Sequence, residues 1–97
     1  MKITKPAFAG TLESSDVQVR VSPNEFDQLN IELNSAVKDQ FGEQILAVVK
    51  AVLAKMEITS ADVIVEDKGA LDCVIRARVQ AAILRSIQPE NINWGQL

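Results

Sequence analysis

The clearest pattern in the sequence is a helical one between residues 37 and 56. Apolar side chains recur there at spacings of three and four, which places them on one broad helical face opposite the polar side chains. The apolar positions are Val37, Phe41, Ile45, Val48, Val49, Val52, Leu53 and Met56. A stripe of this width is buried against another layer of structure, so the chain is expected to fold as a layered domain.

Three further stretches, residues 17–22, 29–34 and 61–66, alternate apolar and polar side chains. This two-residue period is typical of half-buried strands. The first two stretches are separated by a short connection, so we expect them to form an antiparallel pair. The long helix lies between the second and third, which favours a parallel pair joined by a right-handed crossover.

A second helix is expected over about residues 70–86, with Pro89 just past its end. Its apolar side chains lie on several faces, which indicates burial on more than one side. They are Leu71, Cys73, Val74, Ile75, Val79, Ile83, Leu84 and Ile87. The second side of this helix is covered either by a partner subunit or by a terminal segment of the chain, namely the N-terminal arm or the tail with Ile92 and Trp94.

These patterns predict an α+β domain with a small three-stranded sheet, in the order β-β-α-β-α, covered by two helices. The chain of 97 residues is long enough for one core and too short for two. Residues 1–15 lack sustained periodicity and are expected to form an irregular N-terminal arm. Residues 16–88 are expected to be the folded body, and residues 89–97 a tail.

The composition excludes several classes of function. Histidine is absent and Cys73 is the only cysteine, so the usual nucleophile–base pairs and nitrogen-rich zinc sites cannot be assembled. We therefore expect no catalytic residue and no metal site, although carboxylate pairs remain open. A net charge of −3 argues against nucleic acid as a partner. Neither a secretory signal nor an apolar run of roughly 20 residues is found, which predicts a cytoplasmic protein without a membrane span.

Three segments carry a resemblance to a known family. They are Met1-Lys2-Ile3 with Pro6, the run Ala9-Gly10-Thr11-Leu12-Glu13-Ser14-Ser15-Asp16, and the block from Asp67 to Arg78. Together they cover roughly the whole chain at matching spacing, and they resemble the acyl carrier proteins, or gamma subunits, of citrate lyase. Conventional acyl carriers differ, because they are helical bundles with an Asp-Ser-Leu motif that this sequence lacks.

The resemblance implies that Ser14 is a cofactor attachment site. In the family, the matching serine is joined through a phosphodiester to 2'-(5''-phosphoribosyl)-3'-dephospho-CoA, whose thiol carries acetyl or citryl units as thioesters during cleavage of citrate to oxaloacetate and acetate. The implied partners are the alpha subunit (acyl transferase), the beta subunit (citryl lyase) and a prosthetic-group transferase. The carrier itself needs no acid or base, in keeping with its lack of histidine.

Neighbouring residues leave alternatives open. Ser15 stands where the family more often has glycine, but Glu13 and Asp16 set the register and assign the site to Ser14. Glu13 and Asp16 are either solvated charges or contacts for the attaching enzyme, with or without a divalent ion. Cys73 is interpreted as an inert small hydrophobe rather than as an acyl carrier.

The last helix is locally basic, with Arg76, Arg78 and Arg85. These arginines either form surface salt bridges or contact the phosphates of the cofactor. The alternative function from another class is a small non-catalytic adaptor or oligomerisation domain that uses this helix as an interface. A free-standing enzyme that uses carboxylates is a third and weaker hypothesis.

Overall fold

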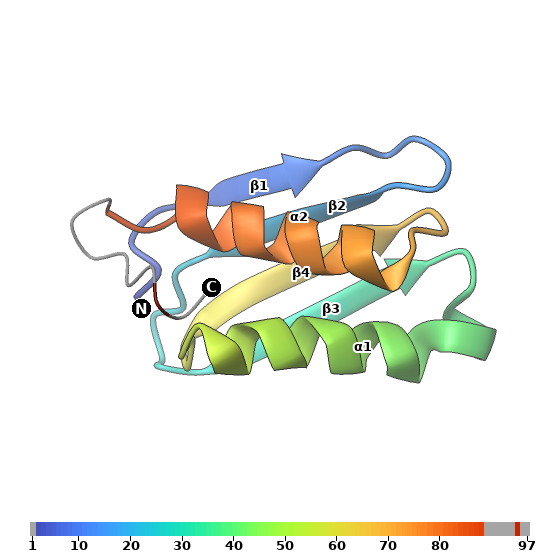
Figure 1. Cartoon of the computed structure of the whole chain (residues 1–97). Helices are drawn as coiled ribbons and strands as arrows, with labels where there is room; N and C mark the ends of the chain where they lie inside the picture. Colours follow the sequence, from blue (N-terminus) through green and yellow to red (C-terminus); the bar gives the residue numbers. More distant parts are fainter. Residues whose placement is uncertain (1, 89–94, 96–97) are drawn as a thin grey trace.

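The computed structural model describes residues 2–88 and Gly95. Figure 1 shows two helices lying on one face of a four-stranded sheet. The elements are β1 (Ala7–Gly10), β2 (Val17–Ser22), β3 (Leu29–Ser35), α1 (Lys38–Lys55), β4 (Ala61–Asp67) and α2 (Asp72–Arg85). The predicted α+β class and the two covering helices are confirmed. Within the described residues, neither helix has the length and apolar character that crossing a bilayer requires.

The prediction of an irregular arm over residues 1–15 is wrong for residues 7–10. These residues form β1, which pairs antiparallel with β2 and sets Ala9 opposite Val19. The sheet therefore has four strands in place of the predicted three, and the element order is β-β-β-α-β-α. Four residues are too few to show a period, and this strand forms because β2 offers it a partner.

The prediction that the first two patterned strands pair with each other is also wrong. The strand order is β1-β2-β4-β3, so β4 lies between β2 and β3. It pairs antiparallel with β2 and parallel with β3, and the latter confirms the expected parallel pair. Residues 23–28 cross two strand spacings, about 10 Å, to make this possible. The central position suits β4 because every second side chain from Ala61 to Asp67 is buried.

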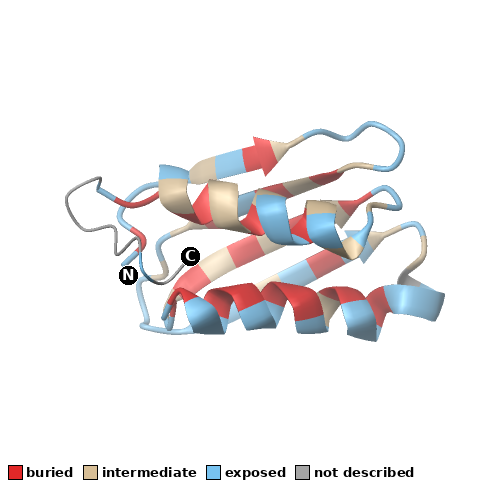
Figure 2. Cartoon of the chain, viewed as in Figure 1, coloured by how far each residue is buried: buried red, intermediate tan, exposed pale blue. Residues whose placement is uncertain are grey.

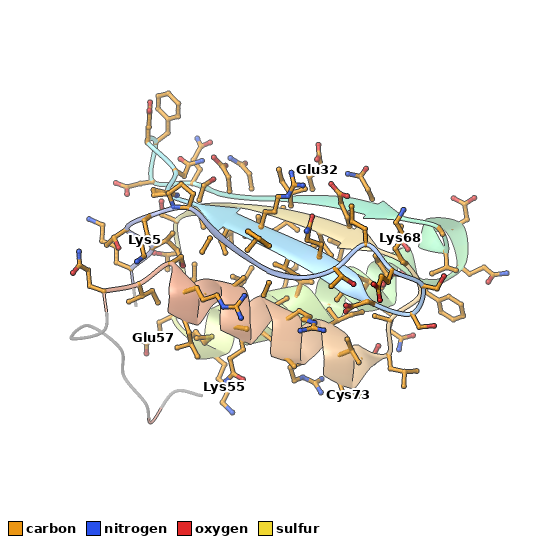
Figure 3. All side chains as sticks on the ribbon, turned by 90° about the horizontal axis from the view of Figure 1, so that it is seen from above. Lys5, Glu32, Lys55, Glu57, Lys68 and Cys73 are labelled. Carbon is orange, nitrogen blue, oxygen red and sulfur yellow. The ribbon has the colours of Figure 1, made fainter. Side chains whose placement is uncertain are left out.

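The core lies between the sheet and the two helices. Val19 of β2 and Val65 of β4 are fully buried on the helix side of the sheet, as are Val49 of α1 and Val79 of α2. Figure 2 shows the buried positions following the inner side of each helix. The opposite face of the sheet is left uncovered, and Glu32 projects from it in Figure 3.

The buried side chains of α2 are Ile75, Val79, Ala82 and Ile83, which lie on its inner side. Ile75 and Ile83 have no exposed surface, whereas Cys73 is exposed. The Thr4 N–H and the Thr4 hydroxyl both donate to the Ser86 carbonyl oxygen just past the helix. The N-terminal segment thus meets the chain just past the end of α2. Burial of α2 on a second side, by this segment or by a partner subunit, stays a prediction, and the alternative that invoked Ile92 and Trp94 lies outside the described residues.

Candidate functional site

The loop of residues 11–16 connects β1 to β2 and lies at one end of the molecule. Figure 1 shows that this end also holds the β4–α2 turn and the beginning of α1. Ser14 lies in this loop and is exposed to solvent. Within the described part of the chain, the Ser14 hydroxyl has no hydrogen-bond partner. An exposed, unpaired hydroxyl is accessible to an enzyme that modifies it.

Ser14 is held in a tight turn. The Asp16 N–H donates to the Glu13 carbonyl oxygen at 3.1 Å, which makes Ser14 and Ser15 the two central residues of the turn. Ser15 has a φ of 66°. A positive φ at the second central position is the type II pattern, which favours glycine because an L side chain is strained there. The geometry thus explains physically why glycine is expected at position 15.

Asp16 organises the loop. Its carboxylate accepts hydrogen bonds from the Thr11 hydroxyl at 2.7 Å and from the Val17 N–H at 2.8 Å. The guanidinium of Arg78 on α2 donates to both carboxylate oxygens, each at 3.2 Å. Hydrogen bonds from Thr11 and Val17, together with the bonds and charge of Arg78, lower the pKa of Asp16 from 3.8 to about 2. Asp16 therefore connects the loop to α2, and 15% of its side chain is exposed.

The loop is also fixed to the β4–α2 turn through its backbone. The Ser15 N–H donates to the Lys68 carbonyl oxygen at 2.8 Å, and the Lys68 N–H donates to the Asp16 carbonyl oxygen at 2.9 Å. These two bonds set Ser15 and Asp16 opposite Lys68, one residue beyond Val17 and Asp67, the last pair of the β2–β4 ladder. The loop that carries Ser14 is thus held on one side by a turn and on another by a helix.

Gly10 makes the start of the loop possible. Its φ is 91°, and a Cβ atom at this position would overlap the carbonyl oxygen of Val17. Only glycine allows the two strands to approach this closely where the hairpin opens. The family run around Ser14 therefore includes one residue that is required by backbone geometry alone.

The three arginines of α2 have different environments. For Arg78, the salt-bridge interpretation is confirmed by its pair with Asp16. Arg85 donates to the Phe8 carbonyl oxygen of β1 at 2.9 Å, so it ties the helix to the edge strand. Arg76 is exposed. Two of the three basic groups thus hold the fold together.

Sequence reasoning missed the role of Asp67, which is 1% exposed. Its carboxylate accepts hydrogen bonds from the Ser35 hydroxyl and from the Ala70 N–H, both at 2.9 Å. The Ser35 oxygen in turn accepts the Val37 N–H at 3.1 Å. Asp67 thereby joins the end of β3, the start of α1 and the turn into α2. The signal was an acidic residue on the apolar side of the alternating β4 pattern.

The carboxylates near Ser14 do not form an evident ion site. Both oxygens of Asp16 accept hydrogen bonds within the protein, so the solvated-charge interpretation is wrong for this residue. Glu13 is exposed. Across the described residues, no three acidic, cysteine or histidine side chains come together to hold a metal ion. Contact of Glu13 with an attaching enzyme stays a prediction.

The exposed Ser14 side chain leaves its oxygen open to a substituent. The hydroxyl has no hydrogen-bond partner among the described residues, while the loop on its C-terminal side is anchored by Lys68 and Arg78. A substituent on this oxygen therefore replaces no hydrogen bond of the described residues. Substituting Thr11 or Asp16 instead would break the contacts that hold the turn.

The chain is similar to known proteins in both fold and sequence. The malonate decarboxylase delta subunit (MdcD) family of acyl carriers matches residues 4–86. One chain in the crystal structure of a Pseudomonas malonate decarboxylase hetero-tetramer in complex with malonate has the same fold. The TM-score is 0.71 at 18% identity, and the match covers 90% of this chain and 93% of that one.

Sequence relatives are closer. The citrate lyase acyl carrier protein of Haemophilus influenzae (strain 86-028NP) is 69% identical over 94 residues, which cover 97% of this chain and 96% of the relative. That of Vibrio cholerae (strain M66-2) is 57% identical over 97 residues, which cover 100% and 99%. The chain belongs to the acyl carrier proteins, or gamma subunits, of citrate lyase.

Proposed function

We propose that Ser14 carries 2'-(5''-phosphoribosyl)-3'-dephospho-CoA through a phosphodiester bond. Membership of the family makes this chain a non-catalytic acyl carrier subunit of citrate lyase, within a multi-subunit complex. What we propose beyond family membership is the attachment residue and the identity of the group. When attached, the group supplies a thiol on which acetyl and citryl units are carried as thioesters.

The observation that carries this proposal is the state of the Ser14 hydroxyl. It is exposed and without a hydrogen-bond partner among the described residues, on a turn whose ends are tied down. A carrier needs a rigid anchor and a mobile arm, because the arm then sweeps a defined volume and reaches its enzymes at high effective concentration. The loop provides the rigid anchor.

Ser15 is the competing hydroxyl, and its environment argues against it. Its backbone N–H is bonded to Lys68, and its φ of 66° is a conformation in which the turn prefers glycine. A position at which glycine is structurally preferred is unsuited to an obligatory side-chain hydroxyl. Ser14 carries no such preference, so we assign the bond to Ser14.

The proposed partners follow from the same assignment. A prosthetic-group transferase would attach the group, and the alpha (acyl transferase) and beta (citryl lyase) subunits would each act on the acyl unit that it carries. The proposed location is the cytoplasm. The adaptor hypothesis loses its support, because the relatives that match the full chain are acyl carriers.

Reconstitution tests this function. The chain, made together with the transferase, is combined with purified alpha and beta subunits, and the release of oxaloacetate from citrate is measured. We expect Ser14→Ala to reduce cleavage to background and Ser15→Ala to retain it. Citrate cleavage at the wild-type rate by a Ser14→Ala complex would refute the assignment.

A further inference from the structure

A groove opens between the beginning of α1 and the beginning of α2. Its volume is about 580 Å³, and its lining includes Phe41 and Ile45 from α1 and Leu71 and Cys73 from α2. This volume falls in the range of small-molecule pockets, roughly 300–1,000 Å³. The groove is thus large enough for an extended organic chain.

Two large apolar side chains of the groove are unusually exposed. Leu71 is 72% exposed and Phe41 is 48% exposed, although both lie beside a well-packed core. Apolar surface gathered at one place in this way usually marks a binding site, because covering it is favourable.

The groove lies close to the Ser14 anchor. Ser15 is bonded to Lys68, and the next two residues, Gly69 and Ala70, line the groove. Counting about 3.8 Å for each step between consecutive Cα atoms and one hydrogen bond, the path from Ser14 to Ala70 is roughly 15 Å. Figure 3 shows Lys68 and Cys73 at the same end of the molecule. A group anchored on Ser14 therefore begins within roughly 15 Å of the groove lining.

The charge of the groove restricts what it can accept. Its lining includes the acidic residues Asp67 and Asp72, and none of the described lining residues is basic. The Gln44 amide donates to Asp72 at 3.0 Å, which places hydrogen-bonding groups at the groove. An uncharged chain of methylene and amide groups suits this lining, whereas phosphates and free carboxylates would be repelled.

We propose that this groove is the resting site of the uncharged distal arm of the prosthetic group in its thiol and acetyl forms. The inference rests on the proposed function, since it requires the arm to be anchored on Ser14. The nucleotide end of the group stays outside because of its phosphates. A citryl unit, with two free carboxylates, weakens docking and leaves the arm extended towards its enzyme.

A small-molecule arm explains the groove better than a partner protein does. A stable protein interface buries about 800 Å² on each partner and is broader than one pocket. Tethering also removes most of the cost of association. At an effective concentration in the millimolar range, a dissociation constant of about 0.1 mM already keeps the arm docked about 90% of the time.

The reactivity of Cys73 reports directly on occupancy of the groove. Cys73 is exposed and lines the groove, and it is the only cysteine of the chain. Its alkylation by iodoacetamide is followed by mass spectrometry in the unmodified chain and in the acetylated holo-protein. Acetylation blocks the thiol of the arm, so only Cys73 reacts. We expect alkylation to be about tenfold slower in the acetylated holo-protein, which corresponds to a docked fraction of about 90%.

Matched variants show whether protection comes from the groove. Phe41→Glu places a charge in the lining and is expected to restore the fast rate. Phe26→Glu makes the same change on the connection between β2 and β3, at the opposite end, where Phe26 is 77% exposed, and is expected to leave protection intact. Equal rates in the unmodified and acetylated proteins would overturn the inference. Protection that appears only when the alpha or beta subunit is added would also overturn it, in favour of a partner surface.

A second measurement tests the charge argument. In a Cys73→Ala holo-protein, the arm thiol is capped either with iodoacetamide, which leaves a neutral amide, or with iodoacetate, which leaves a carboxylate of nearly the same size. Backbone amide chemical shifts of Gln44 and Leu71 are compared with those of the unmodified variant. We expect the neutral cap to move them and the charged cap to move them much less. Equal shifts with both caps would overturn the charge selectivity.

These experiments separate the inference from the function on which it rests. The mass of each sample shows beforehand whether the group is attached. An unmodified chain contradicts the proposed function, whereas an attached arm that leaves Cys73 unprotected contradicts only the docking site.

Discussion

At the scale of single residues, the conformation of the Ser14 loop depends on two carboxylates, those of Asp16 and Asp67. Asp16 collects donors from Thr11, Val17 and Arg78, and Asp67 joins the neighbouring turn to the start of α1. Both carboxylates act as acceptors for groups that would otherwise be unpaired. The position of Ser14 is thus set by neighbours whose role is structural.

The strain at Ser15 gives a prediction at this scale. Ser15→Gly removes the strain of a side chain at a φ of 66°, but it also raises the conformational entropy of the unfolded chain. We expect a net gain of about 0.5–1 kcal/mol in the free energy of unfolding, measured by urea denaturation. The control, Ser14→Gly, has no positive φ to relieve and is expected to be neutral or destabilising. A loss of stability in Ser15→Gly would contradict the turn geometry.

The lowered pKa of Asp16 predicts how stability depends on pH. The folded pKa is about 2 and the unfolded value 3.8, so the carboxylate stabilises the fold above about pH 4, and this contribution is lost as the pH falls towards 2. Asp16→Asn should therefore be less stable than the wild type at pH 7, and the difference should shrink between pH 4 and pH 2. Urea midpoints measured across this range test the prediction. A difference that does not depend on pH would show that the charge of Asp16 is unimportant.

At the scale of elements, the long patterns were predictable and the short one was not. The helix predicted over residues 37–56 is α1, and the alternation of β2, β3 and β4 was recognised within a residue or two of its observed ends. A run of twenty residues repeats a period often enough to identify it. The four residues of β1 do not, because their strand conformation is imposed by pairing with β2.

The strand order could not be read from local patterns either. β2 and β3 are close in the sequence, yet β4 lies between them. The deciding feature is burial across the whole sheet, because β2 and β4 are buried at every second position and lie inside, whereas β3 buries only Leu33 and lies at the edge. The assignment of Ser14 stays a prediction that rests on the resemblance, since an isolated exposed serine carries no periodic signal.

The hairpin of β1 and β2 gives a prediction at the scale of elements. Gly10 and Gly69 both have a positive φ, near 90°, but only at Gly10 would a Cβ atom meet the backbone. We expect Gly69→Ala to cost about 1–2 kcal/mol in the free energy of unfolding from strain alone. Gly10→Ala should cost clearly more, because the hairpin must open. Equal losses in thermal or urea unfolding would show that the close approach at Val17 is not required.

At the scale of the whole molecule, the hydrophobic core and the proposed attachment site lie in different parts of the fold. The core lies between the sheet and the two helices, while the Ser14 loop, the β4–α2 turn and the groove share one end. Under the proposed function, the attached group and the partner enzymes supply the chemistry, and this chain holds the group in position. The absence of histidine from the sequence is consistent with that division of roles.

The central claim is that one hydroxyl, that of Ser14, anchors the prosthetic group. The most direct test is the intact mass of the protein made with its transferase, followed by fragmentation to locate the added mass. The account predicts one covalent addition on Ser14 that is absent in Ser14→Ala and present in Ser15→Ala. An addition on any other residue, or a Ser14→Ala protein that still gains the mass, would contradict it.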